Sequence, residues 1–224
     1  MHLPRGPELT PRDTDILCWL GRHGLATPEQ VARRFFRSTW AAYRRLRKLE
    51  AMALIRRDRT FWKSAHVLRL TAAGARVADA GVGPAELVLA EARHALALVD
   101  LTEALLAEHP GATLVTEREF RAAQLRALRD GTYRRTGRIP DGVLQMSLDE
   151  GGTRVALELD LTNKRAYALT RVIDAYTQLF SATPTDDGFG AVWWYVLPGT
   201  VERVREAVQE ARAIDFIDVR EWEP

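Results

Sequence analysis

The sequence predicts an α+β protein made of two parts that differ in charge and in the order of their secondary structure. Residues 1–80 have the pattern of three helices followed by a β-hairpin, whereas residues 111–224 alternate between short strands and longer helices. Between them, a Gly-Val-Gly-Pro break at 81–84 precedes one long apolar helix. We therefore expect an N-terminal domain at 1–80, a linker helix at 81–110 and a C-terminal α/β domain with a mixed central sheet at 111–224.

The composition is that of a globular protein without a membrane span. Of the 224 residues, 46% are hydrophobic and 28% are charged, which excludes a disordered chain. No apolar run approaches the roughly 18 residues of a membrane helix, and the first residues lack a signal-peptide core. The single cysteine, Cys18, excludes an internal disulfide and a cysteine-based zinc site. We expect a cytoplasmic protein with no membrane partner and no small-molecule cofactor.

The charge is divided unevenly along the chain. The net charge is only +2, but residues 1–80 carry 16 Lys and Arg against 7 Asp and Glu, a local charge of +9. The remaining residues carry 16 against 23, a local charge of −7. A basic segment of this size is the electrostatic footprint of a module that binds nucleic acid. The carboxylates of the acidic part either serve another purpose or form a solvated surface.

Three helix starts can be located before residue 40. Asp13, after a Thr-Pro pair, is expected to cap a first helix that ends at Gly21 or Gly24. Thr27 and Gln30 have the spacing of a capping box, with a proline in the first turn. A serine caps the expected third helix, whose apolar face carries Trp40, Tyr43, Leu46 and Leu49.

The other face of the third helix is basic, and a basic hairpin follows it. The hairpin is expected to return through residues 66–70, with an aromatic and basic tip near Trp62. Three helices and a hairpin in this order are typical of a winged helix-turn-helix, whose third helix enters the major groove of double-stranded DNA while the hairpin touches its backbone. The alternative is a solvated, purely structural charged face. The candidate DNA contacts are Arg44, Arg45, Arg47, Lys48, Arg56, Arg57, Arg59 and Lys63.

The expected linker helix, at residues 85–108, is apolar on more than one face. A surface that broad must pack against a domain or against a second subunit. Winged helices also usually bind paired half-sites. Together, the apolar helix and the expected winged helix favour a homodimer.

An acidic cluster is expected on two strands at 141–148 and 153–161. If a tight hairpin pairs Leu148 with Thr153, Asp141 lies opposite Asp160, and Glu158 lies on the same face of the sheet. Directly opposed carboxylates repel one another, and a divalent cation bound by oxygens would relieve that repulsion. A solvated acidic face is the alternative.

Basic residues surround this acidic cluster in the sequence. Lys164 stands just after the second strand, from where it could reach the carboxylates and a phosphate. Seven arginines precede the cluster and suggest a path for phosphate groups: Arg118, Arg121, Arg126, Arg129, Arg134, Arg135 and Arg138.

The order of these motifs resembles the PD-(D/E)xK nuclease superfamily and, more narrowly, the replication-relaxation family of plasmids and integrative elements. The resemblance covers nearly the whole chain and rests on the stretches 94–100, 116–121, 138–142 and 158–164. It implies a PD-(D/E)xK nuclease-like second domain with Mg²⁺ or Mn²⁺. One position departs from the pattern, because the lysine expected two residues after the glutamate is an aspartate here. The residues implied as metal ligands or catalytic groups are Asp141, Glu158, Asp160, Lys164 and either Glu117 or Glu119.

Two functions are consistent with these patterns. The first is a metal-dependent DNA endonuclease or nickase that the winged helix directs to a site on a plasmid or mobile element. The second is a non-catalytic DNA-binding accessory factor or transcriptional regulator whose second domain is an inactive nuclease fold.

Overall fold

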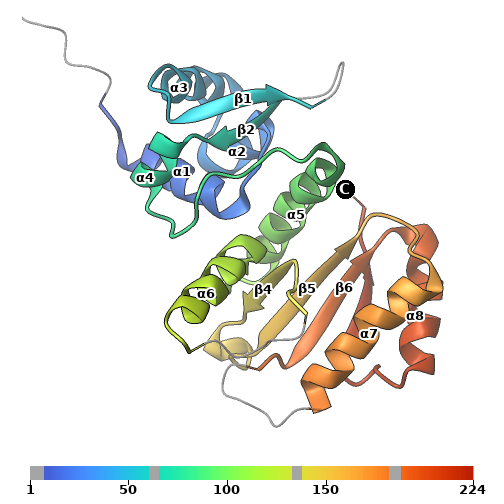
Figure 1. Cartoon of the computed structure of the whole chain (residues 1–224). Coiled ribbons are helices and arrows are strands. Elements are labelled where there is room, and N and C mark those ends of the chain that lie inside the picture. The colour runs from blue at the N-terminus through green and yellow to red at the C-terminus, as the bar shows by residue number, and fades with distance from the viewer. Residues whose placement is uncertain (1–7, 61–65, 133–137, 182–187, 224) are drawn as a thin grey trace, which may run out of the picture. The chain divides into compact units, whose positions relative to one another are not determined.

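The computed structural model is an α+β protein that consists of two compact units, Met1–Asp100 and Leu101–Pro224 (Figure 1). It describes residues 8–60, 66–132, 138–181 and 188–223. The division falls inside helix α5 (Leu89–Glu108), so the helix expected as a linker contributes residues to both units.

The first unit has the predicted order of elements. Three helices precede a two-stranded antiparallel hairpin in which Ile55 pairs with Leu70, and a short helix closes the unit. The elements are α1 (Pro11–His23), α2 (Pro28–Phe35), α3 (Thr39–Ala51), β1 (Ile55–Arg59), β2 (His66–Leu70) and α4 (Ala72–Ala78).

Polar caps fix the helix starts of the first unit. Thr27 and Gln30 form the predicted capping box, and Ser38 accepts a hydrogen bond from the Ala41 backbone N–H, as expected for an N-cap. The prediction that Asp13 caps α1 is wrong. Thr10 is the N-cap, and Asp13 is the third residue of the helix. The two residues form a capping box, in which the Asp13 carboxylate accepts a hydrogen bond from the Thr10 backbone N–H at 2.6 Å.

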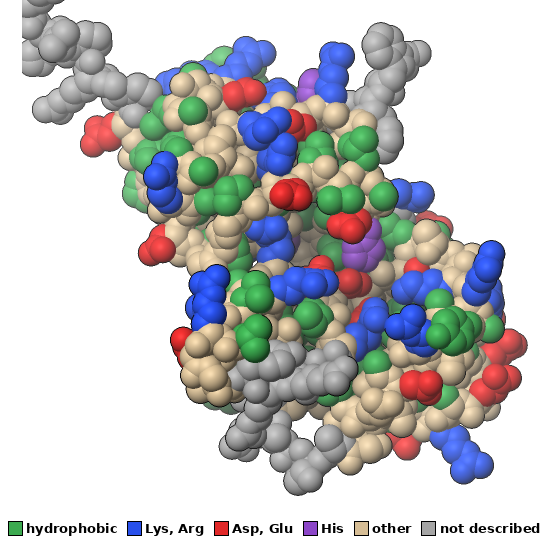
Figure 2. Space-filling view, viewed as in Figure 1, with side chains coloured by type: hydrophobic (Ala, Val, Ile, Leu, Met, Phe, Trp, Pro, Cys, Tyr) green, Lys and Arg blue, Asp and Glu red, His purple; other side chains and the backbone are tan. Residues whose placement is uncertain are grey.

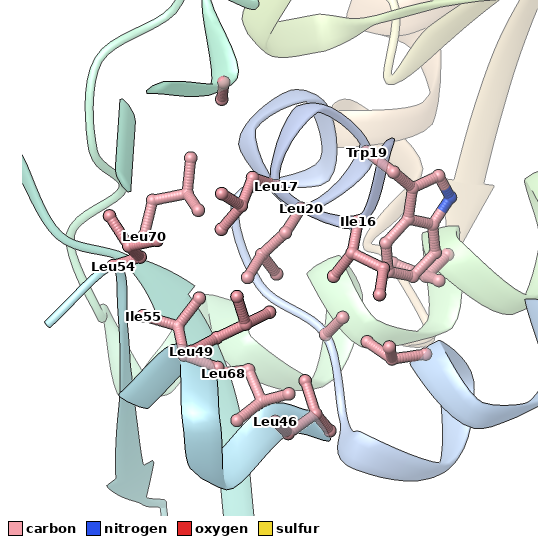
Figure 3. Packing of buried hydrophobic residues seen from close by; sticks show 14 residues of the cluster. Ile16, Leu17, Trp19, Leu20, Leu46, Leu49, Leu54, Ile55, Leu68 and Leu70 are labelled. Atoms are coloured by element: carbon pink, nitrogen blue, oxygen red, sulfur yellow. The ribbon is translucent and has the colours of Figure 1, made fainter. Parts of the chain in front are cut away.

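The core of the first unit joins all its main elements. Leucine and isoleucine side chains from α1, α3 and the hairpin meet in its centre, including Leu17, Leu46 and Leu68 (Figure 3). Val99 of α5 belongs to the same core, and the Gln30 side chain donates to the Leu96 carbonyl at 2.8 Å. The first half of α5 is therefore an integral part of the first unit and not a free linker.

The sequence pattern predicted the wrong environment for one residue of α3. Trp40 was expected on the apolar face, but its side chain is 69% exposed. Leu46 and Leu49 are fully buried, as predicted. Trp40 is the second residue of α3, and its ring pairs with the exposed Arg44 guanidinium instead.

The second unit contains a five-stranded mixed sheet in the order β3-β4-β5-β6-β7. The first three strands are antiparallel, and β5, β6 and β7 run parallel. The strands are β3 (Thr113–Thr116), β4 (Gly142–Gln145), β5 (Arg154–Asp160), β6 (Ala191–Val196) and β7 (Ile217–Glu221).

Helices cover this sheet. Helix α6 (Glu117–Arg129) follows β3, while α7 (Ala166–Ser181) and α8 (Val201–Glu210) pack together on one face (Figure 1). That face is made by small and aromatic side chains such as Ala156 and Trp194. Because β5 is a central strand, six of its seven residues are buried.

The register of the β4–β5 hairpin differs from the prediction by two residues. Val143 pairs with Ala156 and not with Glu158, and the Met146 backbone N–H donates to Thr153 at 2.9 Å. The connection is longer than a tight turn because it contains the short 3-10 helix Leu148–Glu150. Asp141 is therefore not opposite Asp160. A shift of two residues keeps side chains on the same face but changes which of them meet.

The described residues contain no helix that is long and apolar enough to cross a membrane.

Candidate nucleic-acid interface and acidic cluster

The outer face of α3 presents three cations to solvent. Arg44, Arg47 and Lys48 are exposed, and none of them forms an ion pair with another residue that the structure describes. The Arg44 guanidinium lies 4.7 Å from the centre of the Trp40 ring, so the two exposed side chains form a cation–π pair. Figure 2 shows Lys and Arg side chains spread over the visible face of both units. The α3 face thus combines positive charge with an aromatic surface.

Arg45 has a different role from its neighbours on α3. Its guanidinium forms a two-point contact with the carboxylate of Asp13, with Nε 2.5 Å from Oδ1, and its side chain is only 20% exposed. Asp13 is fully buried. Burial raises the pKa of Asp13, but its bonds to Arg45 and Thr10 outweigh burial and hold that pKa below the ordinary value. Arg45 therefore joins α3 to α1 and differs from its solvent-exposed neighbours.

The arginines of the hairpin also differ from one another in their exposure to solvent. Arg56 and Arg59 are exposed, with Arg56 2.6 Å from Asp58. Arg57 is largely buried, 3.6 Å from Glu50. Lys63 and the rest of the expected hairpin tip, Phe61 and Trp62, lie outside the described residues.

A second basic feature beside α3 brings together residues that the sequence pattern does not connect. A hollow of about 470 Å³ at the α2–α3 connection is lined by Arg12, Arg34 and Arg37 together with Phe35 and Phe36. Only Arg34 belongs to an obvious basic run, whereas Arg12 is more than 20 positions away in the sequence. The local pattern could not reveal their convergence.

In the second unit, Glu158 is buried and fully engaged. It is 1% exposed, and Arg138 binds both carboxylate oxygens at 2.6 Å. The Tyr176 hydroxyl of α7 also donates to Oε1 at 2.5 Å. Arg138 was expected to guide phosphate groups, but it forms an internal clamp on Glu158 instead. Arg134 and Arg135 of the same expected path lie outside the described residues.

The electrostatics of this clamp follow from burial and proximity. Burial raises the pKa of Glu158, the Arg138 guanidinium opposes that rise, and the nearby Asp141 charge adds to it. Burial alone would lower the pKa of Arg138, but Glu158 outweighs it and raises that pKa, so the guanidinium stays charged. Burial and the Glu158 charge also raise the pKa of the Tyr176 hydroxyl, which remains a donor.

The other expected ligands have their own partners. One Asp141 oxygen accepts the Leu159 backbone N–H at 2.8 Å, where it extends the β4–β5 ladder. Asp160 is 4% exposed and lies 3.3 Å from Lys164, so the predicted proximity of these two is confirmed. Thr162 donates to the remaining Asp160 oxygen through both its backbone and its hydroxyl.

The two glutamates at the start of α6 are also occupied. Glu117 binds Arg121 at 2.6 Å, one turn further along the helix. Glu119 completes a capping box with Thr116, whose backbone N–H lies 2.8 Å from its carboxylate. The contacts described for these two glutamates do not involve the buried carboxylates of Glu158 and Asp160.

These contacts do not fit a divalent-cation site. Among the described residues, no group of three His, Cys, Asp or Glu side chains is arranged to hold a metal ion. The guanidinium of Arg138 already supplies the positive charge that Glu158 requires, and a divalent cation beside it would be repelled. The arrangement is that of an internal polar clamp between β5, α7 and the residues that precede β4.

Comparison with known proteins identifies the family of this chain. No curated protein matches the sequence. A structure of wild-type ZitR from Lactococcus lactis in complex with DNA matches 58% of this chain and 80% of that chain, at 20% sequence identity and a TM-score of 0.30. The family model described as replication-relaxation matches residues 17–192. That match covers most of the sequence, so the chain belongs to the replication-relaxation family.

Proposed function

We propose that this protein binds double-stranded DNA through its first unit, which acts as a winged helix-turn-helix. The observation that carries this proposal is the two-sided character of α3. Leu46 and Leu49 anchor one side in the core, while Arg44, Arg47 and Lys48 project from the other side. A recognition helix needs both properties, because it must be held rigidly and must present cations to a polyanion. The charge of +9 on residues 1–80 supports the same function.

We further propose that the protein acts in the replication or transfer of a plasmid or mobile element as a non-catalytic factor. Membership of the replication-relaxation family supports the setting. The Arg138–Glu158–Tyr176 clamp supports the absence of catalysis, since it occupies the carboxylate that a nuclease-like site would offer to a metal. The second unit would then contact partners or a second copy of the chain.

A metal-dependent endonuclease is the second candidate. The charge of Asp141 acts on Glu158, and Lys164 lies 3.3 Å from Asp160, so acidic and basic groups of the expected types do gather at the ends of β4 and β5. Catalysis would require Mg²⁺ or Mn²⁺ to displace the partners that these carboxylates now have.

The DNA-binding proposal can be tested by fluorescence anisotropy with a short mixed-sequence duplex in the presence of a chelator. We expect wild-type binding that weakens steeply with salt, and at least about tenfold weaker binding by an Arg44→Gln/Arg47→Gln variant. Arg76→Gln, which removes an exposed charge from α4, serves as the control and should change little. Failure of the wild type to bind at low salt would refute the proposal.

A further inference from the structure

Trp40 and Arg44 form a pair on the exposed face of α3. The Trp40 side chain is 69% exposed, and the Arg44 guanidinium lies over its ring, 4.7 Å from the ring centre. The two residues stand on one side of the helix in successive turns. Leu46 and Leu49 anchor the other side of α3 in the core, so the pair stands on a fixed support.

The contact with Trp40 leaves the N–H donors of Arg44 available. Among the described residues, Arg44 forms no hydrogen bond and no ion pair. An arginine has five N–H donors in a planar fork, and an aromatic ring supplies none of the oxygen acceptors that would occupy them. Arg44 can therefore donate to a ligand while its guanidinium stays on the ring.

The other arginines of α3 lack one of these two properties. Arg45 is held in place, but its donors bind the carboxylate of Asp13. Arg47 is exposed, and in the part of the chain that the structure describes its guanidinium lies over no aromatic ring. A long side chain without a support loses more rotational freedom on binding than one that is already oriented. Arg44 thus combines available donors with a restricted orientation.

The pair lies at the end of α3 that a recognition helix turns toward the bases. Trp40 is the second residue of the helix and Arg44 lies one turn later, after the Ser38 cap and a first turn without acidic residues. In helix-turn-helix proteins the N-terminal residues of the recognition helix contact base edges in the major groove. Guanine presents two acceptors there, O6 and N7, which match two N–H groups of one guanidinium. Adenine presents a donor beside its N7 and does not match.

We propose that Arg44 reads a guanine in the major groove of duplex DNA and that Trp40 is a positioning residue, which orients the Arg44 guanidinium for two hydrogen bonds. This inference rests on the proposed DNA-binding function and adds base specificity to it. Contacts with phosphate groups fix the orientation of a protein on DNA without reading the sequence. The exposed Arg47 and Lys48 suit that second task, because their charge acts without a fixed geometry.

The test first identifies a preferred sequence and then removes one acceptor from it. The wild type is bound, in chelator, to a pool of duplexes with a randomised central segment, and the bound duplexes are sequenced. Anisotropy then compares the preferred duplex with copies in which each guanine is replaced in turn by 7-deazaguanine, which lacks the N7 acceptor. The ratio of the two dissociation constants reports base recognition separately from overall affinity.

Four variants are measured with the same duplexes. Arg44→Gln removes the proposed reader, and Arg47→Gln removes the same charge from the same exposed face as the matched comparison. Trp40→Leu keeps an apolar side chain but removes the ring, whereas Trp40→Phe keeps a ring. Because Trp40 and both arginines are exposed, none of these changes removes a core contact.

We expect the wild type to bind about fivefold more weakly when one particular guanine is replaced. That ratio should fall to about one in Arg44→Gln and in Trp40→Leu. It should keep its wild-type value in Trp40→Phe and in Arg47→Gln, although Arg47→Gln weakens binding to every duplex alike.

The possible failures separate the inference from the proposed function. An unchanged ratio in Arg44→Gln, or a wild type that binds duplexes but selects no guanine, overturns the guanine inference and leaves the DNA-binding proposal standing. An unchanged ratio in Trp40→Leu overturns the positioning role of Trp40. If the wild type binds no duplex, both the inference and the proposed function are overturned.

Discussion

Helix α3 and strand β5 each carry several charged residues, most of which are exposed to solvent on α3 and buried on β5. On α3, Arg44, Arg47 and Lys48 face solvent, because a helix at the surface of a small unit keeps one side uncovered. On β5, Glu158 and Asp160 are buried, because a central strand is covered on both faces. Charges that face solvent are available to a ligand, whereas buried charges must be satisfied inside the protein.

The comparison also holds inside α3 itself. Arg45 is one residue from Arg44, yet it is held by the buried carboxylate of Asp13 in the way that Arg138 is held by Glu158. The coverage of a helix or strand face, and not the number of charges on it, therefore decides which of these charges can reach a ligand.

The largest expected effect concerns the buried clamp of the second unit. Arg138→Met would leave the Glu158 carboxylate buried without its cation, and loss of one partner of a buried ion pair costs about 3–5 kcal/mol. We expect the free energy of unfolding, measured by urea titration, to fall by that amount. Tyr176→Phe should cost about 1.5–3 kcal/mol, because it removes one hydrogen bond to a charged group.

A matched double variant separates the charge from the shape of the clamp. Arg138→Met/Glu158→Leu replaces both ions with apolar groups and should recover much of the stability lost by Arg138→Met alone. A single variant as stable as the wild type would show that Glu158 is open to water and available to a cation.

A smaller and two-sided effect is expected on α3. Arg45→Met removes the partner of buried Asp13 and should lower the free energy of unfolding by about 2–4 kcal/mol while leaving DNA affinity within about twofold of the wild type. Arg44→Gln/Arg47→Gln should do the opposite, with stability changed by no more than about 0.5 kcal/mol. Denaturant unfolding and anisotropy measure the two quantities on the same samples. Equal losses of DNA affinity in both variants would contradict the division between Arg44 and Arg45.

The last expected effect concerns the titration of His23, at the end of α1. Burial first, and then the charges of Arg22 and Arg34, lower the pKa of His23 from 6.5 to about 3. Because the folded pKa lies below the unfolded one, this histidine contributes its full stability above pH 6.5, and that contribution declines as the pH falls from 6.5 toward 3. In NMR spectra the His23 ring signals should not titrate between pH 8 and about 5. A midpoint near the ordinary histidine value would contradict the desolvation of this half-buried ring beside Trp19.

Much of the first unit could be predicted from local sequence. Thr27, Gln30 and Ser38 are caps whose chemistry acts within a few residues, and the hairpin follows from its two short strands. Trp40 was misplaced because an apolar residue near the helical spacing of the core residues was taken as core, although it is 69% exposed. The arginine hollow could not be predicted, because it joins residues from three elements.

The second unit shows where sequence patterns stop being sufficient. The order of strands and helices was predicted correctly, but burial does not alternate along β5, since six of its seven residues are buried. The hairpin register was wrong because it depended on a turn whose length was assumed, and a short 3-10 helix lengthens the connection. The Arg138–Glu158–Tyr176 clamp joins three segments and requires α7 to cover the acidic face, which no spacing in the sequence reveals.

We propose above all that the exposed cations of the first unit bind DNA while the buried carboxylates of the second unit do not cut it. The most direct test incubates the protein with supercoiled plasmid in chelator, in Mg²⁺ and in Mn²⁺, beside an Asp160→Ala variant. We expect retarded DNA in all three conditions and the supercoiled form recovered intact after the protein is removed. Nicked or linear DNA that forms only with metal and disappears in the Asp160→Ala reaction would contradict it.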